Sequence, residues 1–371
     1  MGIYLNPDNS KFKDAVDKKI YVDKSLLIDQ VWMYKERISK YLCVSRPRKF
    51  GKSTDANMLV AYYSKGCDSH DLFDCLNISN TENYLLHLNK HHVIHLNMQD
   101  FLSDSSSIDE MLELIKNELV EECVDEFYFS YNGTISLPRY LAKLEFKRHV
   151  QFIFIIDEWD CIFRDYKEEK DSQKKYFDFL RNLLKDKSYV ECVYMTGILP
   201  IKNNGSLNIF DEISMLEPQP FECFMGFTEV EVQILCNQYS IDYSVMKEWY
   251  GGYQITDTVS TFSPRSVIAS ITREQFSNYW NKTENFEALK YYIDMNFDGL
   301  KESVMKMIAG ESVEVYVQSF SNNMTSFQTK DDIFALLIHL GYLTYSRDKK
   351  TCRIPNKEVA DLFIDSIRSS F

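Results

Sequence analysis

The fold is decided by Arg46-Pro47-Arg48-Lys49-Phe50-Gly51-Lys52-Ser53-Thr54, a stretch that holds one of only 12 glycines in 371 residues. In a phosphate-binding loop (P-loop), backbone amides at a helix N-terminus point at the phosphates, a lysine reaches the β and γ phosphates, and a Ser or Thr hydroxyl ligates Mg²⁺. Gly51, Lys52 and Ser53 fill the last three positions of the pattern GxxxxGK[S/T]. Arg46 stands where the leading glycine belongs, so the match is partial, and ATP with Mg²⁺ is the expected ligand.

The sequence on either side of the loop fits the P-loop interpretation. Residues 41–44 are an apolar run suited to a buried parallel strand, and Pro47 prevents that strand from continuing. Residues 54–64 carry apolar side chains at helical spacing. The predicted order of strand, loop and helix is the one that phosphate binding requires.

A second motif supplies the acidic groups that nucleotide hydrolysis needs. Residues 151–156 are apolar after the first and predict a strand covered on both faces, and Asp157 and Glu158 follow it. This is a Walker B pattern, in which Asp157 supports Mg²⁺ and Glu158 activates water. The alternative is an ordinary strand that ends in acidic residues.

Two further residues lie near these motifs. Thr196 follows a predicted strand at 189–195, where it can sense the γ phosphate or simply begin a turn. Asp160 can support the site, but a solvated loop position is favoured.

Composition bounds the class of protein. The formal charge of −13, with 45% hydrophobic and 14% aromatic residues, indicates a folded protein without bulk attraction to nucleic acid or anionic membranes. The cluster Arg46, Arg48, Lys49 and Lys52 is the exception. Such a cluster is commonly a solvated face, but beside a P-loop we favour phosphate contacts. Nine cysteines without a CxxC pair, no signal-peptide core and no long apolar stretch favour a soluble cytoplasmic protein without membrane contact.

The order of predicted elements indicates a parallel α/β sheet followed by a different kind of structure. Further predicted elements of the first part are a strand at 93–97 and helices at 107–127 and 168–187. From about residue 221 the sequence predicts short helices, at 228–239, 243–249, 264–272 and 284–296. The C-terminal pattern is a helix at 331–339, a hairpin of 342–345 with 352–354, and a helix at 356–370, which suggests a winged-helix unit. We therefore expect three domains, at 1–220, 221–295 and 296–371.

Several motifs in order make the chain resemble the bacterial AAA-ATPase-like family. They are Tyr21-Val-Asp-Lys-Ser25, Arg46-Pro-Arg-Lys-Phe-Gly-Lys-Ser53, Ile156-Asp-Glu-Trp-Asp160, Thr196-Gly197, Gly226-Phe-Thr-Glu229 and Trp249-Tyr-Gly-Gly-Tyr253. The resemblance covers about residues 15–275. It implies a P-loop ATPase core of the additional-strand type, a helical lid and a winged-helix-like C-terminal region. The loop of that family lacks the leading glycine, so residues 46–54 are expected to bind nucleotide as they stand.

The chain also departs from the family pattern. Phe262-Ser-Pro-Arg265-Ser266 replaces the usual Tyr-Asn-Pro-Trp-Ser, so Arg265 is either a nucleotide-sensing arginine or the start of a surface helix. Many members carry a C-terminal nuclease-like domain, and we expect none here. Asp23 and Lys24 shape the nucleotide pocket or cap a helix and form salt bridges, and the histidines between 87 and 95 are expected to be structural.

The leading hypothesis is a Mg²⁺-dependent ATPase that couples ATP binding and hydrolysis to movement of its C-terminal region, with Lys52, Glu158 and Thr196 as catalytic residues and Ser53 and Asp157 at the metal. The alternative is a switch or adaptor that binds nucleotide without hydrolysing it and contacts a protein or DNA. Self-association or an unknown protein partner is expected in either case. DNA binding has weak support, because acidic residues offset the basic ones between 329 and 371.

Overall fold

The chain folds into two compact units in a computed structural model that describes residues 2–131, 133–201, 210–280, 296–317 and 329–368. Unit 1 comprises Met1–Val44, Lys52–Gly197 and Ser206–Glu212, and unit 2 comprises Ser45–Gly51, Ile198–Gly205 and Ile213–Phe371. The P-loop stretch is thus divided between them, since Ser45–Gly51 belongs to unit 2 and Lys52 begins the next part of unit 1. The three expected domains stay a prediction.

Unit 1 is built on a five-stranded sheet of the mixed α/β class. Its order is β2 (His92–Asn97), β3 (Phe152–Asp157), β4 (Val190–Gly197), β1 (Tyr41–Ser45) and β5 (Asp211–Ile213). β3 runs parallel to both β2 and β4, with Ile156 beside Met195. β4 therefore separates the strand before the loop from the strand that ends in Asp157, and the four predicted strands of this sheet are confirmed.

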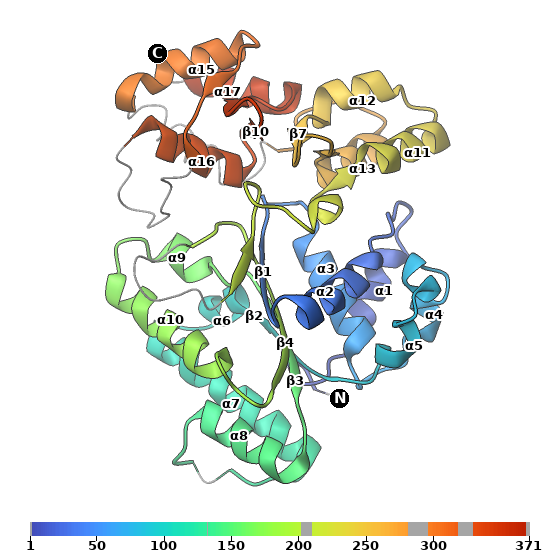
Figure 1. Ribbon diagram of the computed structural model, residues 1–371, viewed down its shortest axis with the longest axis vertical. Coiled ribbons are helices and arrows are strands. Elements are labelled where there is room, and N and C mark those ends of the chain that lie inside the picture. The colour runs from blue at the N-terminus through green and yellow to red at the C-terminus, as the bar shows by residue number, and fades with distance from the viewer. Residues whose placement is uncertain (1, 132, 202–209, 281–295, 318–328, 369–371) are drawn as a thin grey trace. The chain divides into compact units, whose positions relative to one another are not determined.

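Helices cover both faces of this sheet (Figure 1). The helices that precede β2 in the chain are α1 (Ser10–Val16), α2 (Leu26–Arg37), α3 (Lys52–Tyr63), α4 (His70–Phe73) and α5 (Tyr84–His87), with a 3-10 turn at Asn77–Asn80. The others are α6 (Met98–Ser103), α7 (Ile108–Phe127), α8 (Leu137–Arg148), α9 (Cys161–Asp165) and α10 (Lys170–Leu184). Apolar strands such as β3, buried at every residue, need cover on both faces, which explains the layering.

The part of unit 2 that follows β5 contains helices around a small sheet. The helices are α11 (Glu229–Tyr239), α12 (Tyr243–Tyr250) and α13 (Pro264–Arg273), and the antiparallel strands are β6 (Phe227–Thr228), β8 (Ser260–Phe262) and β7 (Tyr253–Gln254). A capping box between Thr228 and Glu231 fixes the start of α11. The three helices agree with the sequence prediction, the small sheet was missed, and the helix expected at 284–296 falls outside the described residues but for its last.

The C-terminal part of unit 2 has a helix, a hairpin and a helix in the predicted order. They are α16 (Lys330–Leu340), β10 (Thr344–Ser346) paired with β11 (Thr351–Arg353), and α17 (Lys357–Arg368), preceded by α15 (Leu300–Ile308) and by β9 (Val313–Glu314), which also pairs with β11. Gly341 ends α16 in a left-handed conformation with φ 84°. A winged helix stays a prediction.

The two parts of unit 2 pack directly on each other. The backbone amide of Gln254 donates to Oγ1 of Thr344 at 2.7 Å, and the side-chain amide of Asn356 donates to the carbonyl of Gly251 at 2.8 Å. A Cβ at Gly252 would lie 2.1 Å from the carbonyl oxygen of Pro355, so only glycine fits there. These contacts explain why the expected lid and the C-terminal region form one compact unit.

No helix in the described part of the chain is long and apolar enough to cross a bilayer.

Candidate nucleotide site

The loop between β1 and α3 turns twice through a left-handed backbone conformation. Lys49 has φ 68° and Gly51 has φ 93°. A Cβ at Gly51 would meet no atom within 4 Å, so the position needs glycine for its backbone angle and not for space. Left-handed residues inside a turn direct neighbouring amides to one side, which is the geometry of an anion-binding concavity.

Three side chains of the loop are built into unit 2. Arg46 is fully buried, and its Nη1 donates to the carbonyl oxygen of Phe224. The Phe50 ring lies edge-on to Tyr253, with 5.1 Å between the ring centroids, and 6.3 Å from the centroid of Trp280. Arg46 and Phe50 therefore anchor the loop.

The third loop anchor is Pro47. It packs so closely on Gly341 that a Cβ there would lie 2.8 Å from the Cβ of Pro47. Arg46, which replaces the usual leading glycine, therefore belongs to a loop whose side chains pack against other residues of unit 2.

The other cations of the loop are half-buried. Arg48 and Lys49 keep partial exposure, and Arg265, in the first turn of α13, is exposed. Burial lowers the pKa of the Lys49 ammonium, the charges of Arg265 and Arg48 lower it further, and Glu358 opposes the shift. Arg48, Lys49 and Arg265 therefore bring positive charge together at this loop within unit 2.

Helix α3 begins at the P-loop lysine. Lys52 is 5% exposed, whereas Ser53 and Thr54 are exposed on the first turn. The unpaired amides and the dipole of a helix N-terminus favour an anion there. An exposed serine hydroxyl directly after Lys52 also suits the position of a metal ligand.

Asp157 and Thr196 meet at the ends of neighbouring strands. The Thr196 hydroxyl donates to Oδ1 of Asp157, and the amide of Glu158 donates to the same oxygen at 3.0 Å. Asp157 is 3% exposed and Thr196 is 1% exposed. A carboxylate held through one oxygen, with an exposed hydroxyl at Ser53, fits a hard cation that prefers oxygen ligands.

Glu158 follows in a left-handed conformation with φ 53°. Its side chain is 24% exposed, so the carboxylate is within reach of solvent. Burial raises the pKa of Glu158, the charges of Lys52 and Arg164 oppose that shift, and Asp160 and Asp157 reinforce it. Glu158 therefore combines partial access to water with a pKa that burial raises, which suits a general base.

The sequence interpretation missed Arg164 and was wrong about Asp160. Asp160 is fully buried, not solvated, and its Oδ2 lies 3.4 Å from Nε of Arg164. Nη2 of Arg164 also donates to Oε2 of Glu158. An arginine directly after the apolar run Cys161-Ile-Phe163, six positions after Glu158, was the available signal.

The remaining candidates have structural contacts. Asp23 accepts the amides of Ser25 at 2.8 Å and Asn77 at 2.7 Å, so its carboxylate links the turn before α2 to the start of the 3-10 turn at Asn77–Asn80. His91 lies 3.0 Å from a ring nitrogen of His87 and makes an ion pair or hydrogen bond with Glu191.

Burial lowers the pKa of His87 to about 4, and the charge of His91 adds to that effect. In the described ranges no group of three or more His, Cys, Asp or Glu side chains is arranged to hold a metal.

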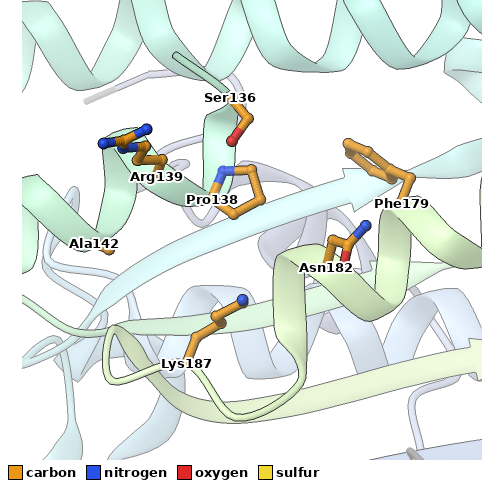
Figure 2. A pocket seen from close by; sticks show the side chains of 7 residues that line it. All are labelled: Ser136, Pro138, Arg139, Ala142, Phe179, Asn182 and Lys187. Carbon is orange, nitrogen blue, oxygen red and sulfur yellow. The ribbon is translucent and has the colours of Figure 1, made fainter.

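A hollow of about 460 Å³ in unit 1 lies elsewhere (Figure 2). It is lined by residues of α8 and α10, among them Pro138, Arg139 and Phe179, and by Lys187 beyond α10. No predicted site residue lines it.

Comparison with known proteins gives one family match. A family model described as "Predicted AAA-ATPase" (AAA-ATPase-like) matches residues 10–207, and no curated protein matches the chain. Among solved structures, the Walker-type ATPase paby2304 of Pyrococcus abyssi is similar with a TM-score of 0.44 and 11% identity, over 92% of this chain and 96% of that one. The Aeropyrum pernix ORC2 protein, solved as ADPNP-ADP complexes, is similar with a TM-score of 0.43 and 12% identity, over 98% of each chain.

Proposed function

Because the chain belongs to the AAA-ATPase-like family of predicted AAA-ATPases, we propose that it binds ATP with Mg²⁺ and hydrolyses it. The observation that carries the proposal is the set of groups at the sheet end of unit 1. Asp157, which accepts a hydrogen bond from Thr196, stands directly before Glu158. The positive charge of Lys52 interacts favourably with the Glu158 carboxylate. A cation, a metal-binding carboxylate and a base are the groups that phosphoryl transfer to water requires.

Binding of the triphosphate is assigned to residues 46–54. The amides of the loop and of the first turn of α3 would face the phosphate oxygens, and Lys52 would contact the β and γ phosphates. Arg48 and Lys49, which are half-buried, would add positive charge. The side chain of Arg46 donates to the carbonyl oxygen of Phe224, so we assign its part in binding to the backbone.

Ser53 and Asp157 would hold the metal. Both hydrogen bonds described for Asp157 use Oδ1, so we assign Oδ2 to the metal shell. Mg²⁺ is commonly held by one or two protein groups together with substrate phosphates, which agrees with the lack of a larger acidic cluster among the described residues. Bound there, Mg²⁺ would neutralise charge on the phosphate oxygens.

The reaction proposed is in-line attack of water on the γ phosphorus. Glu158 accepts a proton from the water molecule while the oxygen atom of that water forms the new bond to phosphorus. The bond to the bridging oxygen breaks, and ADP leaves with that electron pair. Lys52 offsets the charge that develops on the transferred group, and Thr196 keeps Asp157 in place.

We also propose that the cycle is coupled to movement of the C-terminal region. Arg46, Pro47 and Phe50 belong to the phosphate-binding stretch and pack within unit 2. A shift of the loop on binding nucleotide would therefore act on the packing of unit 2. The same observation favours a second candidate, a switch or adaptor that binds nucleotide without turnover and contacts a protein, a second copy or DNA.

Lys52→Ala and Glu158→Gln separate the two candidates. The ATPase proposal expects Lys52→Ala to abolish ATP binding, and Glu158→Gln to bind ATP while phosphate release falls at least ~100-fold. Lys18→Ala, at an exposed lysine of unit 1, is the matched control. Undiminished ATP affinity in folded Lys52→Ala would overturn the proposed site. An ATP-induced rise in melting temperature without phosphate release would identify the switch, and size-exclusion chromatography with mass analysis would detect self-association.

A further inference from the structure

We propose that Arg164 is a positioning residue for this reaction: anchored by Asp160, it holds the carboxylate of Glu158 where that group receives a proton from water. The inference rests on the proposed ATPase function and deepens it. It assigns a role in the reaction to a residue that no sequence motif marks.

The contacts of Arg164 join two carboxylates. The arginine side chain is 10% exposed, its Nη2 donates to Oε2 of Glu158, and its Nε lies 3.4 Å from Oδ2 of Asp160. The planar guanidinium presents donors in fixed directions, so a group held on one edge orients the other edge. Glu158 is thus attached to Asp160 through one rigid cation.

Asp160, which anchors the linked side chains of Glu158 and Arg164, is held in place by packing. Asp160 is fully buried, and a Cβ at Gly197 would lie 3.0 Å from its Oδ1. The amide of Trp159 donates to the carbonyl of Thr196 at 3.0 Å, and the Tyr176 hydroxyl donates to the carbonyl of Trp159 at 2.7 Å. The turn that carries Asp160 is therefore tied to β4 and α10.

The side chain of Glu158, at the other end of this linkage, has rotational freedom that a second contact can restrain. Glu158 is 24% exposed, and three rotatable side-chain bonds separate its carboxylate from the backbone. Arg164 occupies Oε2, which leaves Oε1 to face a water molecule. A misplacement of about 1 Å in a reacting group can cost about 100-fold in rate, so a restraint on Glu158 has a measurable effect.

A structural role for Arg164 predicts something different. A cation that only compensates buried Asp160 would, when removed, cost stability and ATP affinity without a specific effect on turnover. A positioning residue acts through Glu158, so its loss should lower kcat and add nothing once Glu158 is already disabled.

The test measures kcat, KM and the ATP dissociation constant of the full chain. We expect Arg164→Gln to lower kcat roughly 10- to 100-fold with KM and the dissociation constant changed less than about threefold. Arg164→Lys should recover part of the rate, because it keeps the charge and loses the fork. Glu158→Gln with Arg164→Gln should match Glu158→Gln alone, and Arg181→Gln, at an exposed arginine of α10, should match the wild type.

If Arg164→Gln fails to fold because Asp160 loses its cation, Asp160→Asn with Arg164→Gln removes both charges, and the same loss of kcat is expected. Wild-type kcat or a higher kcat in a folded Arg164→Gln or double variant would overturn the inference, since Arg164 would then be neutral or a restraint on turnover. Parallel losses of ATP affinity and stability with unchanged kcat would assign it a structural role. Wild-type protein that binds ATP without releasing phosphate would overturn the proposed function together with the inference, and this outcome is recognised before any variant is made.

Discussion

Thr196 donates its hydroxyl hydrogen bond to Oδ1 of Asp157, which joins the ends of β4 and β3 at the proposed metal position. Both side chains are buried, so the hydrogen bond cannot be replaced by bulk water. We predict that Thr196→Val, which keeps the shape and removes the donor, lowers the free energy of unfolding by about 2 kcal/mol. It should also raise the Mg²⁺ concentration needed for half-maximal ATP hydrolysis.

Thr196→Ser is the matched control because it retains the hydroxyl. Urea unfolding and a Mg²⁺ titration measure the two effects. Equal behaviour of the Val and Ser variants would show that the hydrogen bond does not support Asp157.

Gly51→Ala tests the backbone of the loop. With φ at 93° and no atom within 4 Å of a Cβ, alanine meets an unfavourable backbone angle and no clash. We expect a cost of about 1–2 kcal/mol, which the chain relieves by changing the loop, and a corresponding loss of ATP affinity. Gly51→Asn should be affected less, since asparagine tolerates left-handed conformations better. Calorimetric ATP titration of both variants checks this order.

Phe50→Ala tests whether the loop is anchored in unit 2. Phe50 is 2% exposed and contacts the rings of Tyr253 and Trp280. Truncation should lower the free energy of unfolding by about 3 kcal/mol, because it leaves a cavity in an aromatic cluster. Phe146→Ala removes a ring that is 71% exposed and should change stability little. Similar unfolding midpoints for the two variants would contradict the anchoring role.

Glu358 gives a prediction for pH dependence. The carboxyl group is fully buried in α17, and its Oε1 accepts the amides of Tyr279 at 2.6 Å and Trp280 at 3.0 Å. Burial raises the pKa of Glu358 to about 7, against the opposing effects of those amides, the Ser266 side chain and the charge of Lys49.

The folded state therefore binds this proton more tightly than the unfolded state does. Its contribution to stability is complete below the unfolded pKa, near 4.5, and is lost as the pH rises through about 7. The loss is on the order of 3 kcal/mol. Glu358→Gln keeps an acceptor for both amides and removes the titration, so the difference in unfolding free energy between variant and wild type should grow in favour of the variant from pH 5 to pH 8. A constant difference over that range would contradict the raised pKa.

Local sequence patterns predicted the elements that have strong periodicity or clear ends. The apolar run before Asp157 became β3, and the long amphipathic stretch after residue 107 became α7, whose N-cap Ser107 accepts the amide of Glu110. β5 and the strands of the small sheet in unit 2 were missed, because two- and three-residue strands carry too few side chains to show a period. The 12-residue helix α8 was missed as well.

In the candidate site, too, some residues could be assigned from local sequence patterns and others could not. Lys52, Asp157, Glu158 and Thr196 could be proposed as site residues because each stands at or next to the end of a strand or the start of a helix, where a short motif suggests a chemical role. Asp160 and Arg164 could not be assigned, since the burial of one and the contacts of the other depend on how α9 packs against α10 and α6.

The sequence alone therefore determined the α/β class, the order of strand, P-loop and helix, and membership of a family, because these depend on side chains that are close in the chain. Tertiary structure decided the rest. It placed Thr196 on Asp157 across two strands, it attached Arg46, Pro47 and Phe50 to distant parts of unit 2, and it joined Glu158 to buried Asp160 through Arg164. Each of these contacts depends on which distant surfaces are buried together, and no local periodicity encodes that choice. The P-loop residues are accordingly both a phosphate-binding motif in the sequence and a packing element in the fold.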